Sequence, residues 1–244
     1  ERYVEVYDDV SDIIVHNVRN DQYILSPLLM TEDFETYPAF SRDGKTLFFC
    51  SAPKVDVPAQ AEDLHYNLCS ISFDKGTETF GNQVDTLINA VAAGKSVTFP
   101  RPSYDGRWLL YSYADFGCFP INHKESDLWL LDLQDGSRHP LERANSPYAE
   151  SFHNWSSNSR WCVFSSRRDD GRYTRLYFTH INKEGVAAKP FLMPQEDPIE
   201  YYKELPYAYN VPDFINQPID VNSQSLSEGL LSDERIQITA KAAK

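Results

Sequence analysis

One sequence pattern recurs three times along this chain of 244 residues, and it limits the fold more than any other feature. The copies occupy residues 37–51, 99–113 and 152–166 and align without gaps. Each begins with an aromatic residue, has serine at its fifth position, passes through a short polar turn to Lys or Arg, and ends in an apolar run. Such a repeat indicates one supersecondary unit used several times, because each unit must bury its apolar face against its neighbours.

Each copy is predicted to be a β-hairpin. The dipeptides Asp43-Gly44 and Asp105-Gly106 suit the positive φ angles of a two-residue hairpin turn, and Asn158-Ser159 replaces them in the third copy. The serine at the fifth position can cap the backbone of the turn. The apolar run that follows does not alternate with polar residues, as a strand with one wet face would. We therefore expect hairpins that are covered on both faces.

Two further strands are expected after each hairpin. Third strands are predicted at residues 66–73, 127–133 and 176–181, and fourth strands at residues 84–87, 139–141 and 190–193. Four consecutive antiparallel strands form one blade of a β-propeller, so the fold class is all-β, with blades at about residues 35–90, 98–145 and 150–194. The copies begin further apart than the roughly 40–45 residues of a bare blade. The excess is expected in loops at residues 53–63, 88–95 and 114–126.

The ring of blades is expected to be incomplete. Residues 1–34 match only the third and fourth strands of a blade, which leaves about three and a half blades where closed propellers have about four to eight. Two explanations stay open: the chain is the C-terminal part of a longer protein, which we favour, or the extension at residues 199–244 folds back to help close a small ring. An open edge would invite self-association. A short helix is expected near residues 233–243.

The repeat resembles a known family. Residues 37–45 follow the order aromatic-Pro-x-aromatic-Ser-x-Asp-Gly-Lys, which is similar to the repeat of TolB-like (WD-repeat-like) propellers, and the resemblance covers residues 11–194. The second copy departs from it at Pro102, and the third lacks Asp-Gly. The stretches 113–120, 155–161 and 167–171 look like those of long secreted or periplasmic proteins of Gram-negative bacteria with this propeller at their C-terminal side. The resemblance implies a periplasmic or secreted protein and supplies no reaction.

Charge narrows the range of partners. The formal net charge is -13, with 36 acidic residues against 23 Lys and Arg. Nucleic acids and anionic lipids are bound by clustered cations, so neither is an expected partner. No apolar run reaches the roughly 20 residues of a membrane-spanning helix. The chain opens at Glu1, so the lack of a visible signal peptide says nothing about its compartment.

The four cysteines lie far apart and form no C-x-x-C pair, which disfavours a zinc ribbon, a redox motif or haem attachment. No cofactor is predicted. Cys50, Cys69 and Cys162 lie in apolar runs and are expected to be buried as small apolar residues. Cys118 lies in a loop and is expected to be the most exposed of the four.

Candidate binding residues come from loops and strand ends. His153 lies at the start of an innermost strand and is predicted to face the channel, as a satisfied polar residue or as a ligand. His123, Glu125 and Asp127 alternate across a loop-to-strand junction, where they would form a solvated loop or place metal-capable groups on one side. Two further groups of residues could each form a patch that faces a partner. Alternatively, the first group would plug the channel and the second would be a solvated connection between strands. These are Asp115, Phe116 and Phe119, with exposed rings, and the charged loop of Arg167, Arg168, Asp169, Asp170 and Arg172.

These observations favour a non-enzymatic propeller that binds a protein or glycan partner in the bacterial envelope. No G-x-S-x-G elbow occurs, and neighbouring carboxylates such as Glu32 and Asp33 would point to opposite faces of a strand. Two alternatives stay open. One is a metal-dependent enzyme such as a polysaccharide lyase, with His123 and His153 as the leading ligands. The other is a purely structural domain of a longer protein.

Overall fold

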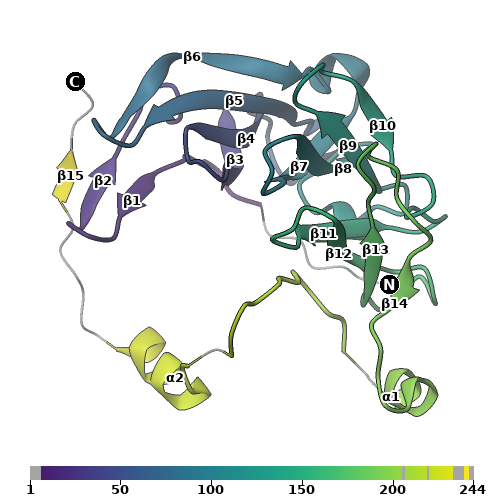
Figure 1. The fold of residues 1–244 in the computed structure, drawn as a ribbon. Coiled ribbons are helices and arrows are strands. Elements are labelled where there is room, and N and C mark those ends of the chain that lie inside the picture. The colour runs from purple at the N-terminus through teal and green to yellow at the C-terminus, as the bar shows by residue number, and fades with distance from the viewer. Residues whose placement is uncertain (1–6, 205–206, 219, 233–238, 242–244) are drawn as a thin grey trace.

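The computed structural model describes residues 7–204, 207–218, 220–232 and 239–241, and it shows an arc of antiparallel sheets (Figure 1). The first blade contains β3 (Phe34–Phe40), β4 (Thr46–Ala52), β5 (Asn67–Asp74) and β6 (Thr79–Ile88). The second contains β7 (Ser96–Pro102), β8 (Trp108–Ala114), β9 (Asp127–Asp132) and β10 (Arg138–Pro140). The third contains β11 (Glu150–Trp155), β12 (Trp161–Ser166), β13 (Arg175–His180) and β14 (Phe191–Leu192).

The predicted fold class is confirmed. Within each blade the strands pair antiparallel and in chain order, which is the four-stranded meander of a propeller. The first strand of every blade is the first strand of the sequence repeat, and β7 of the middle blade contacts both β3 and β11. The three repeats therefore supply the innermost strands of three adjacent blades, in a ring that does not close (Figure 1).

Continuous apolar runs occur because the central strands are dry on both faces. Leu109 of β8 belongs to the core between the first and second blades, where it joins Phe48 and Leu68. Leu110, the next residue, belongs to the core between the second and third blades, beside Phe164. Both leucines have no exposed surface. Successive side chains of a strand point to opposite faces, so a strand between two cores has no position for an alternating polar residue.

Each inner hairpin turns through the same hydrogen bonds. Ser103 Oγ donates to Asp105 Oδ1 at 2.6 Å and accepts from the backbone N–H of Trp108 at 2.9 Å. The other two copies repeat both bonds, which confirms the predicted serine cap. Positive φ occurs only at the second residue of each turn dipeptide, at Gly44, Gly106 and Ser159. In the third copy Ser159 therefore supplies the left-handed backbone, and the side chain of Asn158 serves as the hydrogen-bond acceptor.

The insertions contain single turns of 3-10 helix at Ala61–Asp63, Val91–Ala93 and Pro120–Asn122. Cys50, Cys69 and Cys162 are buried, as predicted. Cys118 is half-buried and packs against the core between the first and second blades, so it is the least buried of the four cysteines, as predicted. The loop that carries it folds down onto the blades instead of extending into solvent.

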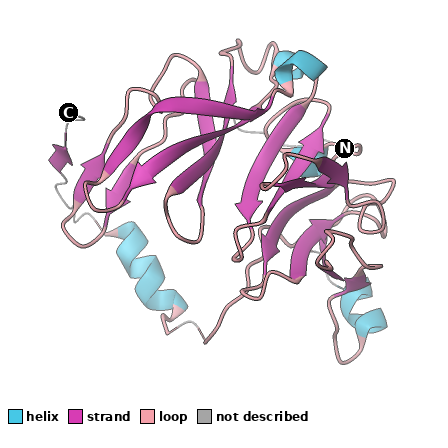
Figure 2. Cartoon of the chain, turned by 45° about the horizontal axis from the view of Figure 1, so that its top comes forward, coloured by secondary structure: helices cyan, strands magenta, loops and turns pink. Residues whose placement is uncertain are grey.

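A smaller sheet stands beside the first blade. β1 (Val15–Asn17) pairs antiparallel with β2 (Gln22–Ile24), and β15 (Thr239–Lys241) pairs in parallel with β2. The chain travels from the third blade to β15 through α1 (Pro198–Glu204) and α2 (Ser223–Leu231), which lie outside the sheets (Figure 2). The extension does fold back. Its strand β15, however, pairs with β2 at one edge of the smaller sheet. Within the described ranges, no inner hairpin pairs with β1 at the other edge.

The helix predicted near residues 233–243 is not formed at residues 239–241, which make a strand, and the rest of that range lies outside the described residues. None of the described helices is long and apolar enough to cross a membrane.

Candidate functional site

Three equivalent aromatic residues meet where the innermost strands come together. Tyr37, Phe99 and Phe152 are the first residues of the three repeats, and all have left-handed backbones, with φ of 54°, 54° and 48°. Each lies where the inner strand shifts register against its partner. The Tyr37 and Phe99 rings have centroids 4.3 Å apart, and those of Phe99 and Phe152 are 5.0 Å apart. A β-bulge changes the direction of the residues after it, so these bulges decide which side chains reach the end of the inner strands.

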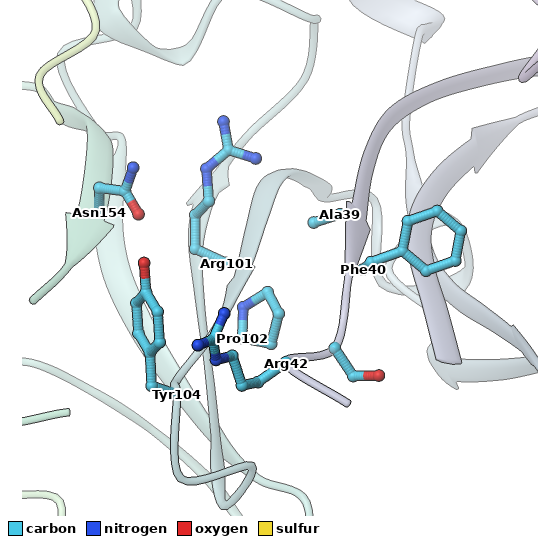
Figure 3. Close-up of a pocket in the computed structure, with 8 residues that line it drawn as sticks. Ala39, Phe40, Arg42, Arg101, Pro102, Tyr104 and Asn154 are labelled. Carbon is cyan, nitrogen blue, oxygen red and sulfur yellow. The ribbon is translucent and has the colours of Figure 1, made fainter. Parts of the chain in front are cut away.

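A pocket of about 280 Å³ lies just beyond these bulges, where the inner strands run into their turns (Figure 3). Its lining comes from all three repeats: Ala39, Phe40, Ser41 and Arg42 from the first, Arg101, Pro102 and Tyr104 from the second, and Asn154 from the third. The third position of the repeat contributes one residue from each blade. Figure 3 shows the guanidinium of Arg42 beside Tyr104, whereas the side chain of Arg101 extends away from Arg42. The ring of Phe40 points away from Arg101 and Tyr104.

The two arginines give this pocket a positive character within an acidic chain. Arg101 is half-buried, and its guanidinium makes no hydrogen bond or ion pair with the residues that the structure describes. Burial lowers the pKa of Arg101, and the carboxylate of Asp213 opposes that shift. Arg42 is exposed and lies over the ring of Tyr104, 5.3 Å from its centroid. Because an arginine fork matches a carboxylate or phosphate, this arrangement can bind an anionic group.

His153 does not line this pocket, although it precedes Asn154. It is 1% exposed, and it occupies the repeat position that holds proline in the other two copies, Pro38 and Pro100. The backbone of Phe99 and Leu110 lies near its ring, but neither ring nitrogen has a hydrogen-bond partner of good geometry. Burial lowers the pKa of His153 to about 3, and the charge of Arg101 adds to the effect. The histidine is therefore neutral and enclosed between blades.

His123 and Glu125 come together, but not as a metal centre. His123 Nδ1 lies 3.5 Å from Glu125 Oε1, and the imidazole packs edge-on against the ring of Phe116, 4.5 Å between centroids. Burial raises the pKa of Asp127 to about 6. No three His, Cys, Asp or Glu side chains of the described residues are grouped as metal ligands. His123 and Glu125 lie together, but among the described residues they are not joined by a third side chain that could bind a metal.

The loop at residues 114–126 differs from its prediction. Phe116 and Phe119 were expected to be exposed, but both are half-buried. Phe116 covers His123, while Phe119 helps line a pocket of about 200 Å³ with Tyr37 and Tyr66. Asp115 is exposed and pairs with Lys95. The rings pack against the blades because the loop is folded over their edge, so the loop presents little aromatic surface.

The charged loop after β12 is largely tied into the third blade. Arg168 binds the buried carboxylate of Glu150 at 3.0 Å, and its guanidinium stacks over the ring of Tyr177 at 4.5 Å. Arg167 donates to Asn122 Oδ1 at 3.0 Å. Asp169 and Asp170 both pair with Arg175, and Asp169 also accepts a hydrogen bond from the hydroxyl of Tyr177 at 2.7 Å. These side chains are engaged within the fold, so a partner-facing role would require them to exchange contacts.

Sequence reasoning missed the pocket residues Arg42, Arg101, Tyr104 and Asn154. A signal was present. The first and fifth positions of the repeat keep their residue types, whereas the third position varies from Ala39 to Arg101 to Asn154. Positions that fill the core must stay similar, while a position that faces an opening is free to vary.

The fold and this site define a β-propeller with an open pocket at the end of its inner strands. No protein-family model matches the chain, and neither does any curated protein. Among solved structures, the chain is similar to the β-propeller domain of the Trilobed protease from Pyrococcus furiosus, with 15% identity, a TM-score of 0.40 and coverage of 67% of this chain and 44% of that chain.

Two further solved structures are similar to the chain. TolB from Acinetobacter baumannii has 15% identity and a TM-score of 0.40, with coverage of 66% of this chain and 33% of that chain. Hydrazine synthase from Kuenenia stuttgartiensis has 12% identity and a TM-score of 0.47, with coverage of 77% and 49%. The chain spans less than half the length of each of these three proteins.

Proposed function

We propose that this chain is a non-enzymatic propeller module that binds a protein or glycan partner in the bacterial envelope, at the pocket formed by the ends of its inner strands. The observation that carries the proposal is the half-buried Arg101, which has no acceptor among the described residues and faces an open pocket shared by three blades. A desolvated cation without an acceptor is costly, so its retention is best explained by an external anionic group. The envelope location rests on the resemblance of the repeat to secreted and periplasmic propellers.

The alternative of a metal-dependent enzyme gains no support from the donor geometry, because His123 and His153 lie in separate surroundings. A structural role has one observation in its favour. The outer face of the third blade leaves Trp161 and Phe191 exposed by 37% and 46%, which suits a surface that packs against a further blade.

Binding arrays test the proposal. The full chain is labelled and applied in parallel to immobilised glycans and to peptides from envelope proteins, and the affinity of each ligand found is then measured for two variants. Arg101→Met removes the pocket cation, and Arg143→Met removes an exposed arginine outside the pocket. We expect the first change to weaken binding about tenfold or more and the second to leave it unchanged.

Two results would reject the proposal. One is equal binding by both variants, which would place the ligand elsewhere. The other is recovery of a shortened or chemically altered ligand after incubation with the chain, which would favour the enzyme alternative.

A further inference from the structure

We propose that the pocket recognises the carboxylate of an extended acidic peptide, and that Asp213 of the chain's own C-terminal extension competes with that carboxylate at the pocket edge. This inference rests on the proposed function and names the ligand class for the same pocket. It is carried by the charges that line the pocket and by the path of residues 207–214 beside it.

The first line of support is the local charge. Arg42 and Arg101 both reach the pocket, and neither forms an ion pair with a described residue, in a chain whose formal net charge is -13. Asn154 completes the lining from the third blade with an amide that can donate. The pocket therefore offers donors and positive charge, which fit a carboxylate and disfavour a cationic group.

The second line of support is the path of the extension. Residues 207–214 form no regular element and run along the outer face of the third blade. The backbone N–H of Tyr209 donates to the Thr174 carbonyl at 3.0 Å, and Ser165 Oγ donates to the Asn210 carbonyl at 2.6 Å. The blade thus already holds an extended peptide through its main chain. Main-chain recognition favours a peptide over a glycan as the occupant, since amide donors and acceptors are common to every peptide.

Residues 207–214 reach the edge of the pocket with an acid followed by an aromatic residue. Asn154 Nδ2 donates to Asp213 Oδ1 at 2.8 Å, and the ring of Phe214 lies against that of Phe178, with centroids 6.1 Å apart. Asp213 is exposed and does not form an ion pair with Arg101, although its negative charge acts on that guanidinium. A carboxylate from outside can therefore gain the full pairing with Arg101 only by displacing the nearby charge of Asp213.

The test uses the full chain and a synthetic peptide with blocked ends that has the sequence of residues 209–215, which includes Asp213 and Phe214. Its affinity is measured by titration calorimetry for the wild type and for Asp213→Asn. The substitution keeps an oxygen that accepts from Asn154 and removes only the charge. We expect the variant to bind the peptide about three- to tenfold more tightly, because a competing charge has been removed. Adding Arg101→Met should abolish the gain, whereas adding Arg143→Met should preserve it.

Two controls separate this inference from the proposed function. A peptide with asparagine in place of the aspartate should lose most of its affinity, and a trigalacturonate should bind more weakly than the acidic peptide. If the trigalacturonate binds in an Arg101-dependent way and the peptide does not, the peptide class is overturned while a binding pocket for a glycan stands. Equal peptide affinity in the wild type and in Asp213→Asn would overturn the competition by the extension.

Discussion

The guanidinium of Arg168 lies 3.0 Å from the carboxylate of Glu150, whose side chain is fully buried. Glu150 lies at the start of β11, and Ser146 and Ser166 also donate to its carboxylate, at 2.6 and 2.8 Å. The cluster joins the first strand of the third blade to the loop before it and to the end of β12. The charged loop that the sequence presents as a surface patch therefore holds an inner strand in place.

Arg168→Met should destabilise the chain by about 3 kcal/mol, because it leaves a buried carboxylate without its cation. Burial raises the pKa of Glu150, while Ser146 and Arg168 lower it, so loss of Arg168 raises that pKa further. A raised pKa in the folded state favours folding at low pH. The deficit against the wild type should therefore shrink as the pH falls toward 4, in urea unfolding measured by tryptophan fluorescence. A pH-independent deficit, or an equal loss in Arg143→Met, would contradict this role.

Two glycines in equivalent turns should respond differently to the same substitution. Gly185, in the turn between β13 and β14, has a φ of 80°, and a Cβ there would lie 2.7 Å from the ring of Trp108 in the neighbouring blade. Gly136, in the turn between β9 and β10, has a φ of 76°, and a Cβ there would have no atom within 4 Å outside its chain neighbours. Gly136→Ala should cost about 1 kcal/mol for the left-handed backbone. Gly185→Ala should cost about 2–4 kcal/mol, because steric overlap between blades is added. Equal losses of thermal stability would show that this turn does not pack against Trp108.

Much of the architecture follows from the repeat, because turn chemistry and apolar patterning are local properties. The dipeptides that begin at Asp43 and Asp105 predict the turns, and the continuous apolar runs predict strands that are buried on both faces. Ser159 is different. It holds a φ of 57° in place of glycine, and its hydroxyl accepts from the backbone N–H of Asp105 at 2.9 Å in the next blade. A contact between residues 54 positions apart is invisible in the sequence around either of them.

The candidate site was less predictable for a related physical reason. His153 and His123 attract attention because imidazole is chemically versatile, yet one is enclosed by the backbone of another blade and the other by Phe116. The sequence does not mark Arg101 as a candidate site residue, since a single arginine in a strand is usually solvated. Its place in the pocket comes from bulges at Phe99 and its two equivalents, which bring the third residues of three repeats together. That convergence is a property of blade packing.

The outer face of the third blade should make the chain self-associate. Trp161 occupies the repeat position of Trp108, but Trp108 is 3% exposed under the turn at Gly185, whereas Trp161 is 37% exposed beside Phe191. An apolar area that is covered in one blade, and left open in the next beside the part of the face that residues 207–214 occupy, favours association. We expect the apparent mass in light scattering to rise with concentration, and Trp161→Arg to suppress the rise. Exposed Val18 lies in the turn between β1 and β2, so Val18→Arg serves as the control. Suppression by both changes alike would argue for non-specific association.

His153 should make the chain sensitive to acid. Its pKa is about 3 in the folded state, against 6.5 for an ordinary histidine, because burial disfavours the charged ring. A lowered pKa means that the stabilisation is complete above pH 6.5 and is lost as the pH falls toward 3. The loss should be about 1.4 kcal/mol per pH unit below pH 6.

His153→Leu removes the titrating group and two unsatisfied ring nitrogens. At pH 7.5 the variant should have nearly the same free energy of unfolding as the wild type, and at pH 5 it should be clearly more stable. Urea unfolding at a series of pH values measures the difference, with the exposed His16→Gln as the matched control. Parallel pH profiles for the wild type and His153→Leu would mean that the ring is hydrated or hydrogen-bonded in solution, and that the acid sensitivity arises elsewhere.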